Sequence, residues 1–484
     1  MQLELNFETA EGVARAPCDG ARAGKRKPAR ACAQPKSKRK RESAVAATMQ
    51  EVIERLESAF EAVAANKGAS GADGQSIGQV RERLQEVLPA LGQALQDGSY
   101  KAGEIRRVWI PKAGGGQRGL GIPNVVDRMV QEAVRQVLEP QYEPTFHEAS
   151  HGFRPGRSCH TAIERAKGYL NEGLEWVVDI DLENFFNRVH HQRLMARLAL
   201  RVQDKSLLRL IGQMLKARVV MPDGVVVGND EGVPQGGPLS PLLSNIVLDE
   251  LDWELEERGH CFVRYADDAN IYVRTQRAGQ RVMASVRGFI ERRLRLKVNE
   301  AKSAVARPQD RHFLGFSLRR EPLQGEVEVG LSMRTKERIG AKLRELTPRN
   351  WGGSMQSCLN RINVYTAGWM GFFGICTEQI ERDLKTLDAH VRRRLRALEL
   401  RQCKRKRSIV RKLMGLGIKS KPAHRAVYTG RKSWWALSHT RAVEMALKNS
   451  LWEERGLQTL AHRYRLHSQR MVAPVAQQYE LAWG

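Results

Sequence analysis

The first regular pattern of apolar residues along the chain is helical. Between residues 49 and 63, apolar side chains recur every three or four positions, at Val52, Ile53, Leu56, Phe60 and Val63. This spacing predicts a helix with one buried face. The glycine-rich run at 66–74 predicts a loop where that helix ends.

Two later segments carry the pattern of strands. Residues 106–112 read Arg-Arg-Val-Trp-Ile-Pro-Lys and lead through consecutive glycines to Arg118, which predicts a hairpin with basic side chains near its tip. Residues 176–182 are mostly apolar and β-branched, which predicts a strand that carries Asp179 and Asp181 towards its C-terminal end. Helical spacing then resumes at Phe185, Phe186, Val189 and Leu194.

A third strand-like segment, residues 262–273, is interrupted by two adjacent carboxylates. Its apolar and aromatic flanks favour strands, whereas Asp267 and Asp268 disfavour them, so we expect a hairpin with the acids at its turn. A turn relaxes the alternation of side chains between two faces. At least one acid can then face a cleft where carboxylate oxygens and phosphate hold a divalent metal. The alternative for an isolated Asp-Asp pair is a solvated turn.

An acid at the end of a strand is a natural partner for this hairpin. Two metals roughly 3.5 to 4 Å apart need ligands from more than one element. We select Asp181 over Asp179 for this role, with the N-cap of a following helix as the alternative for either acid.

A glycine-rich segment, residues 232–241, lies between these acids and precedes an apolar helical pattern at 242–251. Its glycines let the backbone approach a ligand closely, and Gln235 can hydrogen-bond a base or a sugar. The alternative is a plain turn that leads into a core helix.

The composition points to a polyanionic partner. The 484 residues include 80 Lys and Arg against 54 Asp and Glu, a net charge of +26, which favours nucleic acid over a membrane surface. No apolar run approaches membrane-spanning length, and the first residues lack the basic-then-apolar order of a secretory signal. We therefore expect a cytoplasmic protein with no membrane partner. Its scattered cysteines, without a Cys-x-x-Cys pair, indicate reduced thiols rather than a zinc site or a disulfide framework.

Both ends of the chain carry basic runs. Residues 1–47 have few large apolar side chains, so we expect a disordered tail that either meets a polyanion or only aids solubility. Further along, two basic runs predict helices whose positive charge would follow the phosphate backbone of RNA, through Arg392, Arg393, Arg394, Lys404 and Arg405. A solvated helix face is the alternative, and nearby aromatic residues favour RNA, namely Trp369, Trp434 and Trp435.

Taken together, the ordered motifs resemble the reverse transcriptases encoded by group II introns. The resemblance runs from about residue 66 to at least residue 374 and rests first on Asp181 with Phe185-Phe186, Pro234-Gln235-Gly236 and Tyr265-Ala266-Asp267-Asp268. Further blocks follow the same order: Ile110-Pro111-Lys112, Gly121-Ile122-Pro123, Gly152-Phe153-Arg154-Pro155-Gly156-Arg157-Ser158, Asn299 with Lys302, and Phe313-Leu314-Gly315-Phe316. The set is far more specific than any one block.

The resemblance implies an α+β fold of the right-hand polymerase type, with fingers, a palm built on an antiparallel sheet, a thumb and a helical maturase region. The expected segments are a basic tail at 1–47, an N-terminal extension with the fingers at 48–150, the palm with the polymerase active site at 151–320, the thumb and maturase-specific region at 330–415, and a basic extension at 416–484. No cysteine follows Cys403, so we expect no endonuclease domain of the kind that some family members carry.

The same resemblance implies an RNA-directed DNA polymerase, which extends a DNA primer along an RNA template. It would use deoxynucleoside triphosphates as substrates and Mg²⁺ as cofactor. The protein would also bind its intron RNA to assist splicing and mobility. The implied catalytic residues and metal ligands are Asp181, Asp267 and Asp268, with the backbone carbonyl of Leu182 as a further ligand. The implied nucleotide contacts are Lys112, Arg118, Phe186, Gln235 and Lys302. Core packing is the alternative for Phe186, and a plain surface position is the alternative for Lys302.

Two other functions stay open at this point. One is an RNA-binding maturase whose polymerase site has decayed, which the intact acids and nucleotide contacts disfavour. The other is a reverse transcriptase of the same family recruited to defence or repair. A catalytic intron RNA around the reading frame would separate the mobile-intron function from the defence function.

Overall fold

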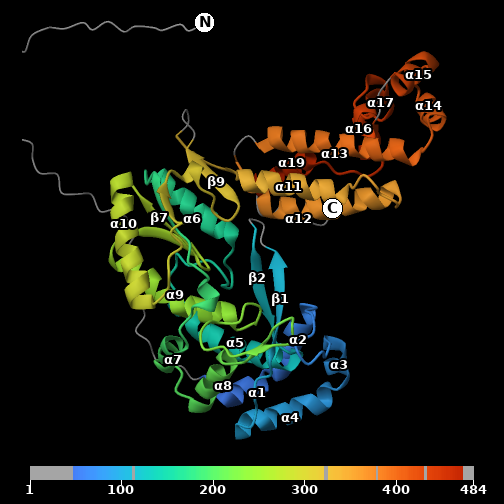
Figure 1. The fold of residues 1–484 in the computed structure, drawn as a ribbon. Coiled ribbons are helices and arrows are strands. Elements are labelled where there is room, and N and C mark those ends of the chain that lie inside the picture. The colour runs from blue at the N-terminus through green and yellow to red at the C-terminus, as the bar shows by residue number, and fades with distance from the viewer. Residues whose placement is uncertain (1–46, 112–114, 321–324, 378–379, 430–432, 473–484) are drawn as a thin grey trace, which may run out of the picture.

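The computed structural model describes residues 47–111, 115–320, 325–377, 380–429 and 433–472, with the side chains of 470–472 excepted (Figure 1). The expected tail and Lys112 lie outside the described residues. Helices and strands alternate along the chain, so the fold is a mixture of helix and sheet, as expected.

The N-terminal region is a layer of helices, α1 (Met49–Glu54), α2 (Leu56–Ala65), α3 (Ile77–Glu82), α4 (Leu84–Asp97) and α5 (Val125–Tyr142). The helix expected at 49–63 is present, but it is divided at Arg55 into α1 and α2. The side chain of Thr48 caps the first turn and that of Glu51 reciprocates, which satisfies backbone donors at the helix start. Val52 and Phe60 are fully buried in the same core as Met129 of α5, so α5 forms the centre of this layer.

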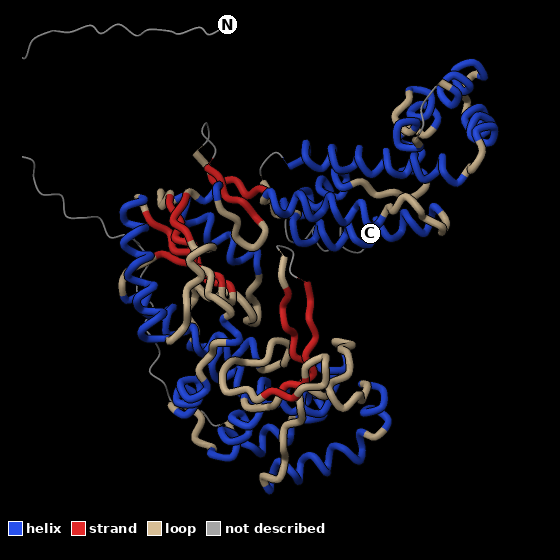
Figure 2. The backbone as a smooth tube through the Cα atoms, in the orientation of Figure 1, coloured by secondary structure: helices blue, strands red, loops and turns tan. Residues whose placement is uncertain are grey.

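A four-stranded sheet rises from this layer in the order β2-β1-β4-β5. Its strands are β1 (Ile105–Pro111), β2 (Gln117–Ile122), β4 (Val219–Val220) and β5 (Val226–Val227). The expected hairpin is confirmed, because β1 and β2 pair antiparallel with Ile110 opposite Arg118. In Figure 2 this hairpin projects away from the helices at its base.

The second four-stranded sheet contains the other expected strands, in the order β6-β7-β3-β8. Its members are β3 (Trp176–Ile180), β6 (Cys261–Tyr265), β7 (Asp268–Val273) and β8 (Ala304–Ala306), and every adjacent pair is antiparallel. Side chains alternate between two cores: Val178 and Ile271 join the core of the N-terminal layer, whereas Val177 and Tyr272 join the core of the C-terminal helices. Both faces of the sheet are therefore covered, and only its edge and strand ends are free for chemistry.

Helices complete this central region: α6 (Cys159–Asn171), α7 (His191–Ala199), α8 (Lys205–Leu215), α9 (Ser240–Glu257) and α10 (Gln276–Phe289). Short helical turns occur at η1 (Glu143–Thr145), η2 (Phe185–Asn187), η3 (Ile290–Leu294) and η4 (Pro308–Asp310). The apolar helix expected after the glycine-rich segment is α9.

The prediction of a helix through 185–194 is wrong in its first half. Residues 185–187 form a single 3-10 turn, and α7 begins only at His191. Asn184 is left-handed, with φ of 50°. The carbonyls of Phe186 and Val189 accept hydrogen bonds from Val233 and Gly232, at 2.6 and 2.8 Å, instead of from a following helical turn. A distant loop therefore overrides the local spacing.

The C-terminal region begins with a two-stranded sheet, β9 (Phe316–Arg320) and β10 (Val327–Leu331). Helices follow: α11 (Met333–Leu346), α12 (Met355–Phe373), α13 (Ile380–Gln402), α14 (Lys406–Gly415), α15 (Ser420–Tyr428), α16 (Trp434–Leu437), α17 (Arg441–Ala446), α18 (Asn449–Glu454) and α19 (Leu460–Val472). In Figure 1 they form an arm beside the central region, and α19 runs back along α13. Within the described parts of the chain, no helix is both long and apolar enough to span a membrane.

Candidate active site

The paired acids lie at a tight turn, as expected. Strands β6 and β7 pair up to Tyr265 opposite Asp268, so Ala266 and Asp267 alone form the turn. Ala266 is left-handed, with φ of 56°, a conformation that is uncommon for a residue with a side chain. A hydrogen bond within the hairpin holds it: Arg264 of β6, which is fully buried, donates to the Ala266 carbonyl at 2.8 Å.

The end of β3 brings Asp181 to the same place. In the pairing of β3 with β7, Ile180 lies opposite Ala269, and the next residues along this register are Asp181 and Asp268. The backbone of Asp181 is held by Ser303, whose hydroxyl accepts from its N–H at 3.0 Å. Two segments far apart in sequence therefore place their acids at one edge of the sheet.

Asp179 of β3 and Asp181, which directly follows β3, have different surroundings, and this bears on which of them could be a metal ligand. Arg311 donates to Asp179 through both Nε, at 2.8 Å, and Nη2, at 2.5 Å. Asp181 instead faces Lys302, whose Nζ lies 3.5 Å from Oδ2 in an exposed position. Asp179 is thus engaged in an internal ion pair, whereas the carboxylate of Asp181 remains at the solvent-facing edge.

Crowding of negative charge perturbs the acids at the turn. Loss of contact with bulk water raises the pKa of Asp268, the charges of Asp267, Asp179 and Asp181 raise it further, and the result is about 7. The pKa of Asp267 is raised by burial and by Asp181, while Arg118 and Arg264 lower it. Repulsion between carboxylates therefore contributes to the shifts of both acids.

This donor set fits a divalent cation. Carboxylate oxygens are the ligands that hard cations prefer, and a cation between them would relieve the repulsion that raises the pKa of Asp268. The described residues nevertheless contain no group of three or more His, Cys, Asp or Glu side chains already arranged around one metal position. Leu182, the expected carbonyl ligand, has a buried side chain and bridges to Val298.

The glycine-rich loop connects this edge to the β1–β2 hairpin. The carbonyl of Gln235 accepts from Gly121 of β2 at 2.7 Å. Gly236 has φ of 124°, and a Cβ there would lie 2.6 Å from the carbonyl oxygen of Gly121, so glycine is required. Arg118 of the same hairpin is exposed, and its positive charge lowers the pKa of Asp267 at the turn.

Phe186, which follows Asp181 closely in the chain, and Lys302, which lies near Asp181 in space, differ in exposure. Phe186 is half-buried and packs edge-on against the buried ring of Phe185, with 5.3 Å between ring centroids. The side chain of Lys302 is 65% exposed, which agrees with a position at the open edge.

The arginines expected to bind RNA have internal partners in two of three cases. Arg393 lies over the ring of Trp435, 4.0 Å from its centroid. Arg394 donates to Thr347 through Nε, at 2.5 Å to the hydroxyl, and through Nη2, at 2.5 Å to the carbonyl. Arg392 makes no hydrogen bond or ion pair within the described chain. These bonds join α13 to its neighbours, so a structural role accounts for Arg393 and Arg394.

Trp369 and the second basic run, Lys404 and Arg405, also differ in whether they are accessible to RNA. Trp369 is buried, with 8% of its surface exposed, and packs on Phe373, so it is not available to stack on RNA. Lys404 and Arg405 lie between α13 and α14 and are exposed. They are open to a ligand, and Trp369 is not.

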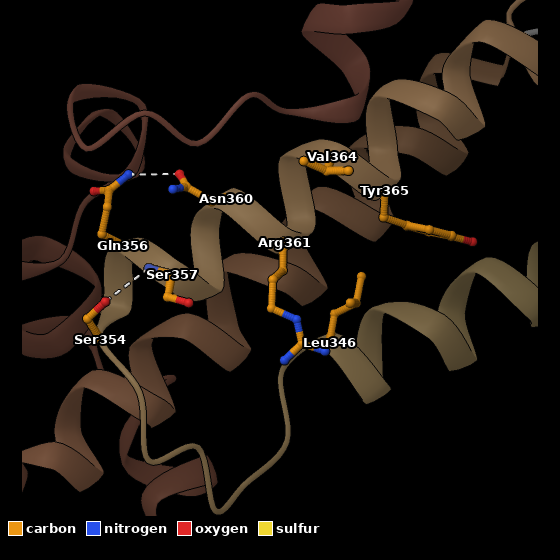
Figure 3. A pocket seen from close by; sticks show the side chains of 8 residues that line it. All are labelled: Leu346, Ser354, Gln356, Ser357, Asn360, Arg361, Val364 and Tyr365. Carbon is orange, nitrogen blue, oxygen red and sulfur yellow. Dashed lines mark hydrogen bonds between the residues drawn. The ribbon is translucent and has the colours of Figure 1, made fainter. Parts of the chain in front are cut away.

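Figure 3 shows a concave region on α12, whose lining includes none of the three acids. Its lining residues come from the end of α11, the start and middle of α12 and the loop between them. Polar groups within it already pair: Gln356 donates to Asn360 at 3.1 Å, and the Ser357 N–H donates to the hydroxyl of Ser354 at 3.1 Å. Unlike the sheet edge, its lining contains no acid.

Sequence reasoning missed the residues that hold the turn in place. Arg264 donates to both carboxylate oxygens of Asp252, to Asn245 at 3.0 Å and to Ser150 at 2.7 Å, all in the interior. A usable signal was present, because Arg264 is a charged residue inside an otherwise apolar strand, where burial requires partners. Gly152 also touches the turn, since a Cβ there would lie 2.3 Å from the Ala266 nitrogen.

Comparison with known proteins identifies the family. A model described as "Reverse transcriptase (RNA-dependent DNA polymerase)" matches residues 110–318, and one described as "Group II intron, maturase-specific domain" matches residues 336–414. Protein YkfC of Escherichia coli K12 is 33% identical over 341 residues, which cover 62% of this chain and 87% of that protein.

Other relatives match over shorter parts. Group II intron-encoded protein LtrA of Lactococcus lactis subsp. cremoris is 39% identical over 198 residues, which cover 40% of this chain and 32% of that protein. A solved structure titled "Partial Cas6-RT-Cas1--Cas2 complex" is 25% identical over 50% of this chain and 42% of the other, but its TM-score of 0.33 is too low to support an argument. On the two family models and the near-complete coverage of YkfC, the chain belongs to the group II intron reverse transcriptase and maturase family, whose enzymes are RNA-directed DNA polymerases.

Proposed function

We propose that this chain copies RNA into DNA at a metal site formed by Asp181, Asp267 and Asp268, and that it binds a group II intron RNA to assist splicing and mobility. The observation that carries the proposal is the convergence of these three acids at one edge of the β6-β7-β3-β8 sheet. All three lie inside the segment that matches the reverse transcriptase model.

The shape of the chain suits the right-hand arrangement. In this proposal the β1–β2 hairpin belongs to the fingers, the sheet that carries the acids is the palm, and α11, α12 and α13 form the thumb with the maturase-specific region. The domain boundaries at 48–150, 151–320, 330–415 and 416–484 follow from it. Contact between the Gln235 loop and β2 supports a nucleotide site between fingers and palm, since it joins the two.

The acids would hold the cation, and the backbone carbonyl of Leu182 would complete its ligands. Magnesium, when bound, would activate the 3′-hydroxyl of the DNA primer and stabilise charge on the phosphoryl group during transfer. Asp179 would take no part, because Arg311 occupies its carboxylate.

The remaining polar residues would position the deoxynucleoside triphosphate. Arg118 would bind the triphosphate with its forked guanidinium, together with Lys112. Gln235 would contact the nascent base pair, and Phe186, half-buried beside Phe185, would crowd the sugar 2′ position and favour deoxynucleotides. Lys302, 3.5 Å from Asp181, would neutralise charge or donate a proton at the leaving pyrophosphate.

The RNA-binding part of the proposal rests on cations of the C-terminal region, of which Lys404 and Arg405 are exposed and Arg392 is half-buried. Lys404, Arg405 and Arg392 are the residues that we expect to contact phosphates, since they lack the internal bonds of Arg394. Such contacts would make RNA affinity fall steeply with salt.

Primer extension tests the proposed function directly. The purified chain should extend a DNA primer on an RNA template with Mg²⁺, and Asp267→Ala should abolish extension while RNA binding is retained. Asp223→Asn is the matched control, since Asp223 is an exposed acid in the β4–β5 turn, where asparagine preserves the turn. Full activity of Asp267→Ala would show that the metal site is assigned wrongly.

A further inference from the structure

Phe153 combines two features that are rarely found together. Its side chain is 46% exposed, and its backbone is left-handed, with φ of 57°. Single exposed apolar residues are common on protein surfaces, but an aromatic residue in the left-handed region is uncommon, and such conformations concentrate at ligand sites. Leu200 is a useful contrast, since it is 72% exposed with an ordinary φ of −64° at the end of α7.

Buried arginines fix the chain on both sides of Phe153. On one side, Arg154 donates to the carbonyls of His147, at 2.6 Å, and Ser150, at 2.9 Å, and to the carboxylate of Glu143, at 2.9 Å. On the other, the hydroxyl of Ser150 accepts from Arg264 at 2.7 Å. These bonds hold the strained residue in place, so its exposed ring is presented in one position.

This segment lies directly against the acidic turn. The His151 N–H donates to the Arg264 carbonyl at 2.8 Å, and Gly152 fits against Ala266 only because it has no Cβ. The ring of Phe153 lies 6.4 Å from that of Tyr265, at an interplanar angle of 45°. Tyr265 is paired with Asp268 across the hairpin, so the two rings lie beside the turn that carries the proposed metal ligands.

We propose that Phe153, with Tyr265 beside it, is a stacking surface for a base of the template–primer duplex next to the metal site. The inference rests on the proposed function, because it takes the duplex as the ligand. An exposed, pre-positioned ring suits this ligand, since every base offers a flat face and stacking tolerates any sequence. It also gives a role to the Gly152–Ser158 block, which neither metal nor nucleotide binding explains.

Two substitutions at one position separate stacking from backbone structure. Phe153→Gly removes the ring and relieves the left-handed backbone, whereas Phe153→Tyr keeps a ring of the same size. Leu200→Ala is the matched control for loss of an exposed apolar side chain. Affinity for a fluorescein-labelled RNA-template and DNA-primer duplex is measured by anisotropy, and fold stability by thermal unfolding.

The expected result is a rise in Kd of about tenfold for Phe153→Gly, which is the size of a single base–aromatic contact. Its Tm should be no lower than that of Leu200→Ala, and Phe153→Tyr should bind as the unmodified chain does. A 2-aminopurine at the primer terminus or at the templating position should be quenched by the unmodified chain and less so by Phe153→Gly, a readout that a merely structural role would not change.

Either of two outcomes would overturn the inference: unchanged duplex affinity of Phe153→Gly, or equal loss of affinity in Phe153→Gly and Phe153→Tyr. Primer extension by the unmodified chain is scored separately. Extension with unchanged affinity of Phe153→Gly would remove the stacking role and leave the polymerase function standing.

Discussion

The acidic edge of the central sheet and helix α13 both concentrate charge, but they differ in where that charge finds partners. At the sheet edge, the backbone brings Asp181, Asp267 and Asp268 together, and burial and the neighbouring acids raise the pKa of Asp268. On α13, Arg394 and Arg396 donate into the protein, to Thr347 and to the carbonyl of Leu447. Like charges that crowd together mark a site for a ligand, whereas charges with internal partners hold the fold together.

The same contrast occurs within the central region itself. Arg264 and Asp252 form an ion pair in which each side chain is 1% exposed, and the arginine also bonds the carbonyl of Ala266. A fully partnered pair therefore supports a turn whose acids repel one another.

The largest expected effect is a difference in the rate of primer extension between Asp181→Asn and Asp179→Asn. Asp181→Asn should slow primer extension by at least about a hundredfold, because a metal ligand supplies several kcal/mol of transition-state stabilisation. Asp179→Asn should retain most of the activity, since Arg311 already occupies that carboxylate. Single-turnover rates check both variants, and equal rates for the two would contradict the assignment of Asp181.

Removing the buried arginine should affect stability next most strongly. Arg264→Met leaves Asp252 buried without its partner, which should lower the free energy of unfolding by about 3 to 5 kcal/mol. Arg264→Met with Asp252→Leu should recover part of this loss. Arg81→Met, which breaks the exposed pair with Glu61, is the control and should cost less than about 1 kcal/mol. Urea unfolding measures all three, and a loss for Arg264→Met as small as the control's would contradict the role of the buried pair.

Acid should destabilise the region around His151. Burial lowers the pKa of His151 to about 3, and the charges of Arg157, Arg165, Arg154 and Arg264 add to this effect. The unfolded chain binds this proton below about pH 6.5, whereas the folded chain does not until about pH 3, so stability is full above 6.5 and falls as the pH drops. Between pH 7 and 5 the unmodified chain should lose up to about 2 kcal/mol more than His151→Asn. Urea unfolding at both pH values tests this, and parallel pH dependence of the two proteins would argue against a neutral His151.

The smallest effects are expected on α13, where neighbouring arginines should behave differently. Arg394→Ala should lower the free energy of unfolding by about 1 kcal/mol with little change in RNA affinity, because its donors bond Thr347. Arg392→Ala should leave stability unchanged and reduce the slope of log Kd against log salt by about 1. RNA titrations at several salt concentrations check the pair. If Arg394→Ala reduced the salt slope and Arg392→Ala did not, the division between structural and RNA-binding arginines would be reversed.

Local signals predicted the strands and the hairpins. Alternating apolar residues and acids at a turn are properties of neighbouring residues, so the β6–β7 hairpin and the β1–β2 hairpin could be placed from sequence. The prediction of a helix through 185–194 failed because the N–H of Val233, in a loop far along the chain, donates a hydrogen bond to the Phe186 carbonyl. Secondary structure that depends on such a distant donor is not encoded in local spacing.

In the candidate site too, some features could be predicted from local sequence, whereas others depend on residues far along the chain. The acids were selected from sequence because carboxylates inside an apolar strand pattern are conspicuous, and their role as metal ligands stays a prediction. Arg311 distinguishes Asp179 from Asp181, and it is more than a hundred residues away from both in the chain. The internal partners of Arg393 and Arg394, and the burial of Trp369, likewise depend on how α13 and α12 pack.

The central claim is that the acids of the sheet edge form a cation site. Titration with Mn²⁺, with free ion followed by electron paramagnetic resonance, tests it without relying on catalysis. The unmodified chain should bind Mn²⁺, Mg²⁺ should compete for it, and the double variant Asp267→Asn with Asp268→Asn should lose this binding while Asp223→Asn keeps it. Equal binding of Mn²⁺ by the unmodified chain and the double variant would contradict the claim.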